Sequence, residues 1–292
     1  MSKGPGAPVV VGVDGSASAL EAVEWAADEC LRHHVPLRLV HAYPMPIPSR
    51  DDIGLVGEDL NRALQAQGRK WLRRAQDTAR VIAPDVTVTT RIASTGDVPL
   101  LVDESERARL VVLGSRGLGG FSDLLVGSTA LALVSHGKCP VVVARDTPAP
   151  DGPVIVGVDG SPVSEAAVAF AFEAASIRGA SLTAVMSWQD FLLDSGYRDT
   201  KIATDWTQVE DDERRLLAQR LAGWQEKYPD VYVDRVVERD RAARVLMRLG
   251  ERARLLVVGS HGRGGFTGML LGSTARTLVH HAPCPLAVVR RS

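Results

Sequence analysis

Hydrophobic and polar positions follow two alternating periods along the chain. The β-branched run VVVGV at 9–13 is followed by a longer segment, from Ser16 or Ser18 to about His34, whose apolar residues recur at helical spacing. The apolar stripe of this segment consists of Ala19, Ala22, Val23, Ala26 and Ala27. Strand and helix then succeed each other strictly, which predicts a parallel sheet with helices on both faces, because a crossover between parallel strands passes over one face of the sheet.

The same alternation predicts the remaining elements of the N-terminal half. We expect further strands at 37–42, 86–93, 110–114 and 140–145. We expect further helices at about 59–82, 98–107 and 128–136. With the strand at 9–13, these elements predict a five-stranded, doubly wound α/β domain.

The chain contains an internal repeat. VVVGVDGS at 9–16 recurs as VIVGVDGS at 154–161, and GSRGLGGFSDLLVGST at 114–129 recurs as GSHGRGGFTGMLLGST at 259–274. Both pairs are separated by 145 residues, so the chain holds two copies of one domain with almost no net insertion. The segment ARDTPAPDGP between them is typical of a linker. We predict domains at 1–147 and 152–292.

Composition places the chain among ordinary globular proteins. Of its 292 residues, 45% are hydrophobic and 24% charged, with a formal net charge of −1, which argues against a nucleic-acid partner. The three cysteines show no CxxC spacing, so we expect buried, reduced thiols rather than disulfides or a zinc site. No signal peptide or apolar run of membrane-spanning length is present, which predicts a cytoplasmic location without a membrane partner.

Two turns in each copy lie where ligands bind in such sheets, outside the carboxyl ends of the strands. The turn after the first strand is VDGS, with Asp14 or Asp159 at the strand end and Ser16 or Ser161 as the N-cap of the next helix. The turn after the fourth strand is the glycine-rich segment. Because both turns follow parallel strands, we expect them to face one crevice.

The glycine-rich segment has the spacing G-x-x-G-x9-G-S. Its motif residues are Gly114, Gly117, Gly127 and Ser128 in the first copy, and Gly259, Gly262, Gly272 and Ser273 in the second. We expect these glycines to take positive φ and to bring backbone N–H groups close to an anion without an intervening Cβ atom. The helix that follows offers further N–H donors and a positive dipole end. The segment therefore predicts a polyphosphate site made mainly by backbone.

Other phosphate motifs are excluded. A Walker A loop needs a lysine before the serine, and none precedes Ser128 or Ser273. The dinucleotide fingerprint G-x-G-x-x-G follows the first strand, whereas this segment follows the fourth. A glycine-rich tight turn without a ligand is the alternative, and the repetition of both turns at a constant separation disfavours it.

VVGVDGS at the amino end, the glycine motif after the fourth strand and CPVVVAR at 139–145 resemble the universal stress protein family in its tandem two-domain form. The resemblance covers nearly the whole chain. It implies two Rossmann-like domains of the adenine nucleotide alpha hydrolase-like fold and one ATP site in each. It also implies that the edges formed by the fifth strands pair, so that the domains form a pseudo-dimer within the chain, and that two chains can form a homodimer.

The resemblance also implies roles for individual residues. Val13 and Val158 would lie beside the adenine, and Ala42 and Ser187 would offer it backbone groups. Asp14 and Asp159 would lie near the ribose and phosphates and help to hold Mg²⁺. The ribose and triphosphate would be wrapped by the motif residues and the following threonines: Gly114, Gly117, Gly127, Ser128 and Thr129 in the first copy, and Gly259, Gly262, Gly272, Ser273 and Thr274 in the second.

The two copies differ at a few positions of interest. Arg116 of the first glycine segment corresponds to His261 of the second. An arginine is always charged and a histidine is mostly neutral at pH 7, so our hypothesis is that the first site holds a triphosphate more tightly. His41 corresponds to Met186, which favours a packing role for His41 over that of a catalytic base. Trp71 and Trp224, 153 residues apart, are expected to pack at nearly equivalent depths of equivalent helices.

Three functional classes remain open. The favoured one is a nucleotide-dependent stress-response protein that acts through an unidentified regulatory protein partner. A slow ATPase or a nucleotidyl or phosphoryl transferase would use the same sites, but phosphoryl transfer also needs a positioned acceptor or base, and the motifs supply none. A scaffold with empty sites is the third. Because the motif indicates phosphate and only the resemblance indicates adenine, cyclic AMP or another adenine nucleotide also stays open.

Overall fold

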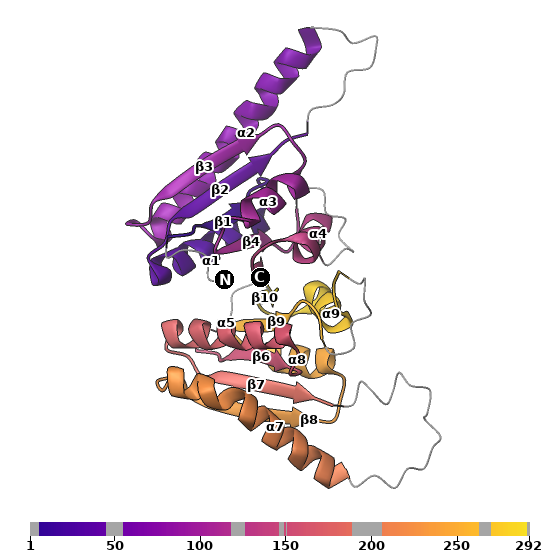
Figure 1. The fold of residues 1–292 in the computed structure, drawn as a ribbon. Helices are drawn as coiled ribbons and strands as arrows, with labels where there is room; N and C mark the ends of the chain where they lie inside the picture. The colour runs from indigo at the N-terminus through magenta and orange to yellow at the C-terminus, as the bar shows by residue number, and fades with distance from the viewer. Residues whose placement is uncertain are drawn as a thin grey trace, which may run out of the picture. The chain divides into compact units, whose positions relative to one another are not determined.

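The computed structural model describes residues 6–44, 55–117, 126–145, 149, 151–188, 206–262 and 270–290. The chain divides into two compact units, residues 1–145 and 146–291, which we call domain 1 and domain 2. Figure 1 labels the helices and strands of both. Each domain is an α/β unit with a parallel sheet, as the alternation of strand and helix predicted.

Domain 1 contains a five-stranded sheet in the order β3-β2-β1-β4-β5. Its strands are β1 (Val9–Gly12), β2 (Leu37–Ala42), β3 (Val88–Ala93), β4 (Leu110–Gly114) and β5 (Val141–Ala144). Its helices in the described residues are α1 (Ala17–His33), α2 (Leu55–Ile82), α3 (Asp97–Ser105) and α4 (Ser128–His136). All four strand pairs are parallel. The predicted elements are therefore present, with α2 beginning four residues earlier than the apolar pattern indicated.

Domain 2 repeats this arrangement, with the strand order β8-β7-β6-β9-β10. Its strands are β6 (Val154–Val158), β7 (Leu182–Ser187), β8 (Val233–Glu238), β9 (Leu255–Gly259) and β10 (Leu286–Val289). Its helices in the described residues are α5 (Pro162–Arg178), α7 (Trp206–Lys227), α8 (Ala242–Gly250) and α9 (Ser273–His281). The register repeats too, because Val9 pairs with Leu37 in domain 1 and Val154 pairs with Leu182 in domain 2.

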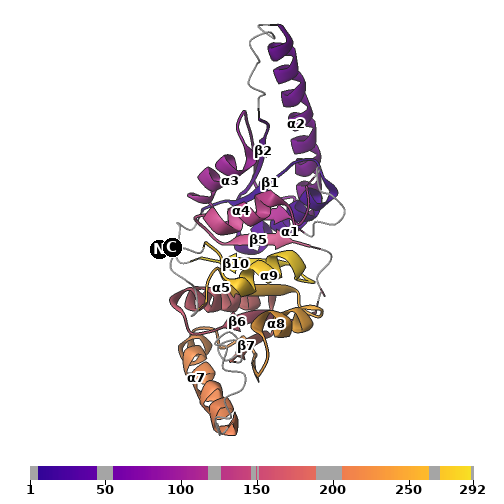
Figure 2. The ribbon, with the colours of Figure 1, turned by 90° about the vertical axis from the view of Figure 1, so that its right-hand side faces the viewer.

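The strand order explains how the helices cover the sheet. In domain 1 the chain runs outward from β1 to β3 and then crosses back to β4 and β5 on the other side of β1. Right-handed crossovers therefore place α1 and α2 on one face of the sheet and α3 and α4 on the other, as Figure 2 shows. Within each pair the two helices contact each other. The direction reverses beside β1, so the ends of β1 and β4 border the crevice where such folds bind ligands.

The inner strands read as continuous apolar runs because helices cover both of their faces. In β1, Val9, Val10 and Val11 are fully buried, and so are Val111 and Val112 in β4. The outermost strand β3 is only partly covered, and its Thr89 and Thr90 are exposed. A well-packed sheet therefore gives the strand ends near β1 and β4 fixed positions.

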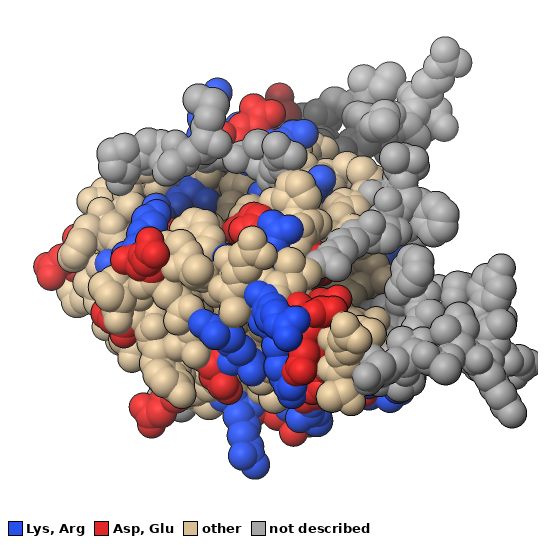
Figure 3. Space-filling view, turned by 60° about the horizontal axis from the view of Figure 1, so that its bottom comes forward, with Lys and Arg blue, Asp and Glu red and all other residues tan. Residues whose placement is uncertain are grey.

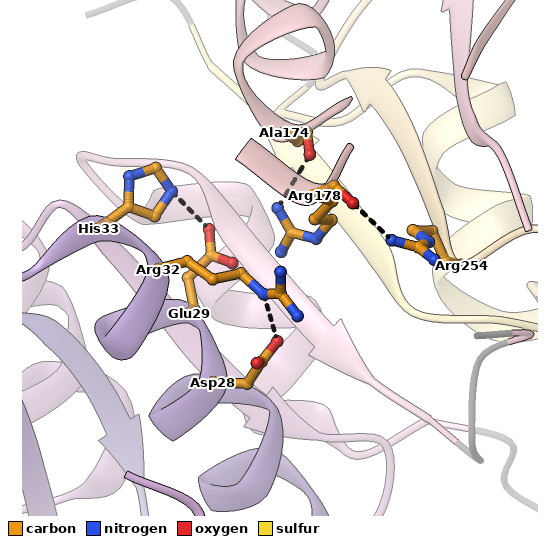
Figure 4. Close-up of polar contacts among 7 residues, drawn as sticks. All are labelled: Asp28, Glu29, Arg32, His33, Ala174, Arg178 and Arg254. Atoms are coloured by element: carbon orange, nitrogen blue, oxygen red, sulfur yellow. Dashed lines mark hydrogen bonds and ion pairs between the residues drawn. The ribbon is translucent and has the colours of Figure 1, made fainter. Parts of the chain in front are cut away.

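Short-range polar contacts hold the last turns of the helices that follow the first strand of each domain (Figure 4). On α1, Arg32 pairs with Asp28 at 2.7 Å and His33 with Glu29 at 3.1 Å. On α5, Arg178 Nη1 donates to the carbonyl oxygen of Ala174 at 3.2 Å. Cations in a last turn also suit the negative end of the helix dipole.

The three cysteines, Cys30, Cys139 and Cys284, are buried, as expected, and none of them is in a disulfide bond. Burial is the main cause that raises the pKa of Cys30 to about 12, and the charge of Glu29 adds to it. A thiol with such a pKa carries almost no thiolate at neutral pH, so Cys30 is inert as a nucleophile or metal ligand.

Charges of both signs are interspersed on the face of the molecule drawn in Figure 3. In domain 2, ion pairs join Arg214 to Glu210 at 2.5 Å and Arg215 to Asp212 at 2.8 Å along α7. Exposed pairs of this kind contribute little stability each, at most about 1 kcal/mol. In the described parts of the chain, no helix is both long enough and apolar enough to span a bilayer.

Candidate functional site

The turn after β1 holds Asp14 in a fixed orientation. Ser16 donates to Asp14 Oδ1 from its backbone N at 2.9 Å and from its hydroxyl at 2.6 Å, and Ser16 Oγ also caps α1 by accepting from Ala19 N at 3.1 Å. The turn requires positive φ at Gly15 (91°). There the Trp71 indole also occupies the space that a side chain would need. The aspartate at this strand end is therefore positioned by its own turn and by α2.

Domain 2 builds the same turn. Ser161 donates its backbone N–H to Asp159 Oδ1 at 2.9 Å and accepts from Ser164 N at 3.1 Å as the N-cap of α5. Gly160 has a φ of 76°. The two aspartates predicted from the repeated VDGS thus accept the same backbone hydrogen bond in turns with the same backbone form.

The glycine segment closes on itself at the end of β4. Gly127 N donates to the carbonyl oxygen of Ser115 at 3.0 Å, and in domain 2 Gly272 N donates to that of Ser260 at 2.8 Å. These bonds bring the two ends of the segment together, although residues 118–125 and 263–269 lie outside the described residues. The first and last glycines of the motif are therefore neighbours in space.

Close approach, rather than unusual backbone angles, accounts for two of the motif glycines. A Cβ atom at Gly114 would lie 2.5 Å from the carbonyl oxygen of Ser18, and one at Gly117 would lie 2.8 Å from Asp14 Oδ2. A Cβ atom at Gly262 would likewise lie 2.6 Å from Asp159 Oδ2. Our expectation of positive φ at the motif glycines is wrong. Among the described residues the glycines with positive φ are Gly15, Gly160 and Gly179, none of which belongs to the motif.

The helix after the glycine segment begins at a glycine, so no N-cap side chain covers its first N–H groups. Gly127 is the N-cap of α4, with φ −67° and ψ 149°, and makes no side-chain cap hydrogen bond. Gly272 is the N-cap of α9 in the same way. The following residues, Ser128 and Thr129 or Ser273 and Thr274, form the first turn of each helix. A helix start of this kind attracts anions.

A cavity of about 440 Å³ lies at this end of domain 1. All nine residues that we predicted for the first site line it: Val13, Asp14, Ala42, Gly114, Arg116, Gly117, Gly127, Ser128 and Thr129. They come from the ends of β1, β2 and β4 and from the start of α4, so segments spread over more than 100 residues of sequence meet at one cavity.

Ten further residues, which were not predicted for this site, also line the cavity: Gly12, Ala19, Val40, His41, Asp97, Leu100, Leu101, Leu113, Val126 and Ala130. Most are apolar and give the cavity a hydrophobic wall. Asp97, Leu100 and Leu101 belong to α3, which follows β3. The position of α3 along the chain could have predicted these residues, since the first turn of α3 also lies at the carboxyl end of the parallel sheet.

Asp97 is the charged residue that α3 contributes. Its Oδ1 accepts from Val98 N at 2.9 Å, and its Oδ2 accepts a hydrogen bond from the Thr129 hydroxyl. The carboxylate therefore joins the first turn of α3 to the first turn of α4.

His41 has a structural role in the cavity wall, as the sequence analysis favoured. Its ring is buried, contacts Trp71 edge-on at a centroid distance of 5.2 Å, and bonds through Nδ1 to the carbonyl oxygen of Val13 at 2.7 Å. Since a carbonyl can only accept, Nδ1 carries the proton. The ring thus supports the strand end beside Asp14.

The remaining predicted residues of domain 2 lie at the corresponding strand ends. Val158, Ser187 and Gly259 are the last residues of β6, β7 and β9. The Ser187 hydroxyl donates to the carbonyl oxygen of Asp240. His261 Nδ1 lies 3.1 Å from Ser260 Oγ. Domain 2 therefore has the same framework, with different side chains on it.

The tryptophans are not at equivalent positions, which corrects our expectation. Helices α2 and α7 end at Ile82 and Lys227, which are 145 residues apart, so Trp71 corresponds to Leu216 rather than to Trp224. Trp71 lies against His41 near the cavity, whereas Trp224 stacks with Phe172 at 6.1 Å.

Comparison with known proteins gives a consistent picture. The profile of the universal stress protein family matches residues 7–145 and 152–290. The chain is 42% identical over 297 residues to a universal stress protein of Mycobacterium tuberculosis, with 97% of each chain covered. It is 40% identical over 292 residues to one of Mycolicibacterium smegmatis, covering 97% of this chain and 96% of the relative.

The fold is also that of a solved structure. A universal stress protein from Archaeoglobus fulgidus superimposes with a TM-score of 0.74 over 98% of each chain, at 18% sequence identity. Two matches to the family profile, one in each domain, agree with the internal repeat. The chain belongs to the universal stress protein family.

Proposed function

We propose that the protein binds an adenine nucleotide, with ATP as the first candidate, in the cavity of domain 1 and at the matching strand ends of domain 2. Binding would alter how the protein engages a regulatory partner during stress. The observation that carries this proposal is that residues predicted from separate motifs line one cavity, together with an uncapped helix start. The volume of the cavity, about 440 Å³, lies in the range of small-molecule sites.

The residues in the cavity suit the parts of a nucleotide. Val40, Leu100 and Leu113 offer an apolar surface to a base, and the first turn of α4 offers backbone donors to phosphate. Close passage of the chain at Gly117 leaves its backbone accessible where a side chain would collide with Asp14. ATP binding with micromolar affinity, about −8 kcal/mol, needs only a few charge-assisted contacts together with burial of the base.

Mg²⁺ would accompany the nucleotide rather than occupy a site of its own. Among the described residues, no group of three or more His, Cys, Asp or Glu side chains is placed to hold a metal ion. Mg²⁺ is commonly held by one or two carboxylates together with phosphate oxygens of a bound nucleotide. Asp14 and Asp159, as carboxylates at the strand ends, fit that mode.

Binding is favoured over catalytic turnover because Asp14 and His41, two titratable groups of the cavity, have structural tasks. Asp14 accepts from Ser16, and His41 donates to the carbonyl oxygen of Val13. Hydrolysis would need one of them to orient a water in line with the γ-phosphate. A slow ATPase or a transferase that uses the same sites is the second candidate. Measurement of ADP formation, described next, distinguishes it from a protein that only binds the nucleotide.

The test begins with denaturing the purified protein and identifying any released nucleotide by chromatography. Calorimetric titration with ATP and with cyclic AMP then compares the wild type with Gly117→Val and Gly262→Val, each of which places a side chain against the site aspartate. We expect loss of one binding event in each variant and no ADP above background. Failure of the wild type to bind either nucleotide at millimolar concentration would disprove the proposal. Steady ADP formation that Asp14→Ala and Asp159→Ala abolish would establish the enzyme.

Assembly and location remain proposals of the same kind. We propose a cytoplasmic protein whose two domains act as a pseudo-dimer and whose chains can form a homodimer. Light scattering after size-exclusion chromatography, with and without ATP, measures the mass. A monomeric mass under both conditions would contradict the homodimer.

A further inference from the structure

The two copies of the site differ in charge at one position that the glycine motif does not include. The offset of 145 residues places Ala242 of α8 at the position of Asp97 of α3. Asp97 is the acidic residue in the first turn of α3, whereas the first turn of α8 has none. The residue before them also changes, from Gly96 to Arg241.

Asp97 acts at the end of the cavity that attracts anions. Its carboxylate accepts from the hydroxyl of Thr129, which belongs to the first turn of α4 and lines the same cavity. A second hydrogen bond, from Val98 N at 2.9 Å, keeps the carboxylate from turning away. The negative charge therefore lies beside the helix start that would receive phosphate, and it opposes a polyphosphate bound there.

Arg116 also lines the cavity and carries the opposite charge. Arg116 and Asp97 are both exposed, so water and salt screen both charges, while two hydrogen bonds fix the Asp97 carboxylate beside the start of α4. Asp14 lies next to Gly117 and has its counterpart, Asp159, next to Gly262 in domain 2, so it does not distinguish the two sites. In domain 2 the nearest acidic residue before α8 is Asp240, whose carboxylate accepts from Arg241 N at 2.7 Å and pairs with Arg244 at 3.2 Å.

We propose that Asp97 makes polyphosphate binding in domain 1 depend on a divalent cation, and that domain 2, with Ala242, binds the same ligand without one. A cation between a carboxylate and a phosphate turns repulsion into attraction, and Mg²⁺ is well suited to this because it uses carboxylate and phosphate oxygens together. This inference rests on the proposed nucleotide binding. It reverses our sequence-based hypothesis that Arg116 gives domain 1 the tighter site, as far as metal-free ATP is concerned.

The experiment uses the full chain with one site blocked at a time. Gly262→Val leaves the site of domain 1 to be measured, and Gly117→Val leaves that of domain 2. ATP is titrated by calorimetry in EDTA and in excess Mg²⁺. We expect the affinity of domain 1 to rise at least tenfold with Mg²⁺ and that of domain 2 to change less than threefold.

Two reciprocal substitutions assign the effect to this position. Asp97→Asn keeps the shape of the side chain and one acceptor oxygen for Val98 N, and its NH2 group can donate to the Thr129 hydroxyl oxygen, so the fold should be retained. In EDTA it should raise the affinity of domain 1 for ATP about fivefold and reduce the dependence on Mg²⁺. Ala242→Asp should lower the affinity of domain 2 in EDTA by a similar factor, and adenosine, which has no phosphate, should bind all variants alike.

Each result has one meaning. If ATP binds but Asp97→Asn lowers its affinity equally with and without Mg²⁺, Asp97 is a direct ligand contact and the inference is wrong. If both domains depend equally on Mg²⁺ and neither substitution changes this, the inference is also wrong while nucleotide binding stands. If no nucleotide binds to the wild type under either condition, the proposed function itself fails.

Discussion

His41 Nδ1 and the carbonyl oxygen of Val13 lie 2.7 Å apart in a buried hydrogen bond, which joins the ends of β1 and β2 beside the cavity. Replacing His41 with leucine would leave this carbonyl without its donor. Because an unpaired buried polar group costs about 1–3 kcal/mol, we expect the free energy of unfolding to fall by about that amount, measured by urea denaturation of the full chain.

Met186→Leu is the matched control for His41→Leu, since Met186 is the residue of domain 2 at the same offset. Met186 is buried, and exchange of two apolar side chains of similar volume should cost less than about 1.5 kcal/mol. Equal losses in the two variants would show that packing, and not the hydrogen bond, sets the cost at His41.

The motif glycines should separate into a structural and a ligand-contacting group. A methyl group at Gly114 would lie 2.5 Å from the carbonyl oxygen of Ser18, whereas the nearest atom of the described residues to one at Gly127 is Gly117 N, at 4.0 Å. Gly114→Ala should therefore destabilise the protein by about 1–3 kcal/mol, as overpacking does. Thermal unfolding measures this loss.

Gly127→Ala should leave the melting temperature nearly unchanged and still weaken ATP binding, because the added methyl group faces the cavity that Gly127 lines. The measurement is ATP titration alongside thermal unfolding of the same preparation. A Gly127→Ala protein that binds ATP as well as the wild type would count against phosphate binding at the start of α4.

Glu104 should contribute to the stability of domain 1 through two arginines. Its carboxylate is mostly buried and pairs with Arg38 at 2.8 Å and with Arg91 at 2.6 Å. Because both arginines are partly exposed, solvent screening reduces the effect, and we expect Glu104→Gln to lower the free energy of unfolding by about 1–2 kcal/mol. Asp103→Asn, which removes an exposed partner of Arg91, should cost less than about 0.5 kcal/mol and serves as its control.

The cysteines should react only after unfolding. The pKa of Cys30 is raised from 9.0 to about 12, so at pH 8 its thiol is protonated as well as buried. A raised pKa stabilises the fold below pH 9.0, and this contribution is lost as the pH rises toward 12. Mass spectrometry after iodoacetamide treatment at pH 8 should find Cys30 unmodified in the native protein and fully modified in guanidinium chloride. Rapid modification of the native protein would contradict this assignment.

Features that depend on local sequence were predictable, and those that depend on contacts between distant segments were not. The strand ends and the N-caps Ser16 and Ser161 follow from apolar runs and capping chemistry within a few residues. The reason for Gly114 is different, because it depends on the approach of Ser18, nearly 100 residues earlier. The φ angles of the motif glycines were wrongly predicted for the same reason.

The contribution of α3 to the site was missed because its residues carry no motif. Asp97 becomes part of the cavity only through the crossover that brings the first turn of α3 beside that of α4. Likewise, the distance between Trp71 and Trp224 along the chain did not reveal that they occupy different turns of α2 and α7.

The covalent linkage of the two domains has an evolutionary consequence. In a homodimer of single-domain chains, one gene encodes both sites, so every substitution appears twice. Here Asp97 can differ from Ala242, and Arg116 from His261, because each site has its own codons. Gene duplication and fusion thus permit one site to specialise while the other keeps its ancestral chemistry.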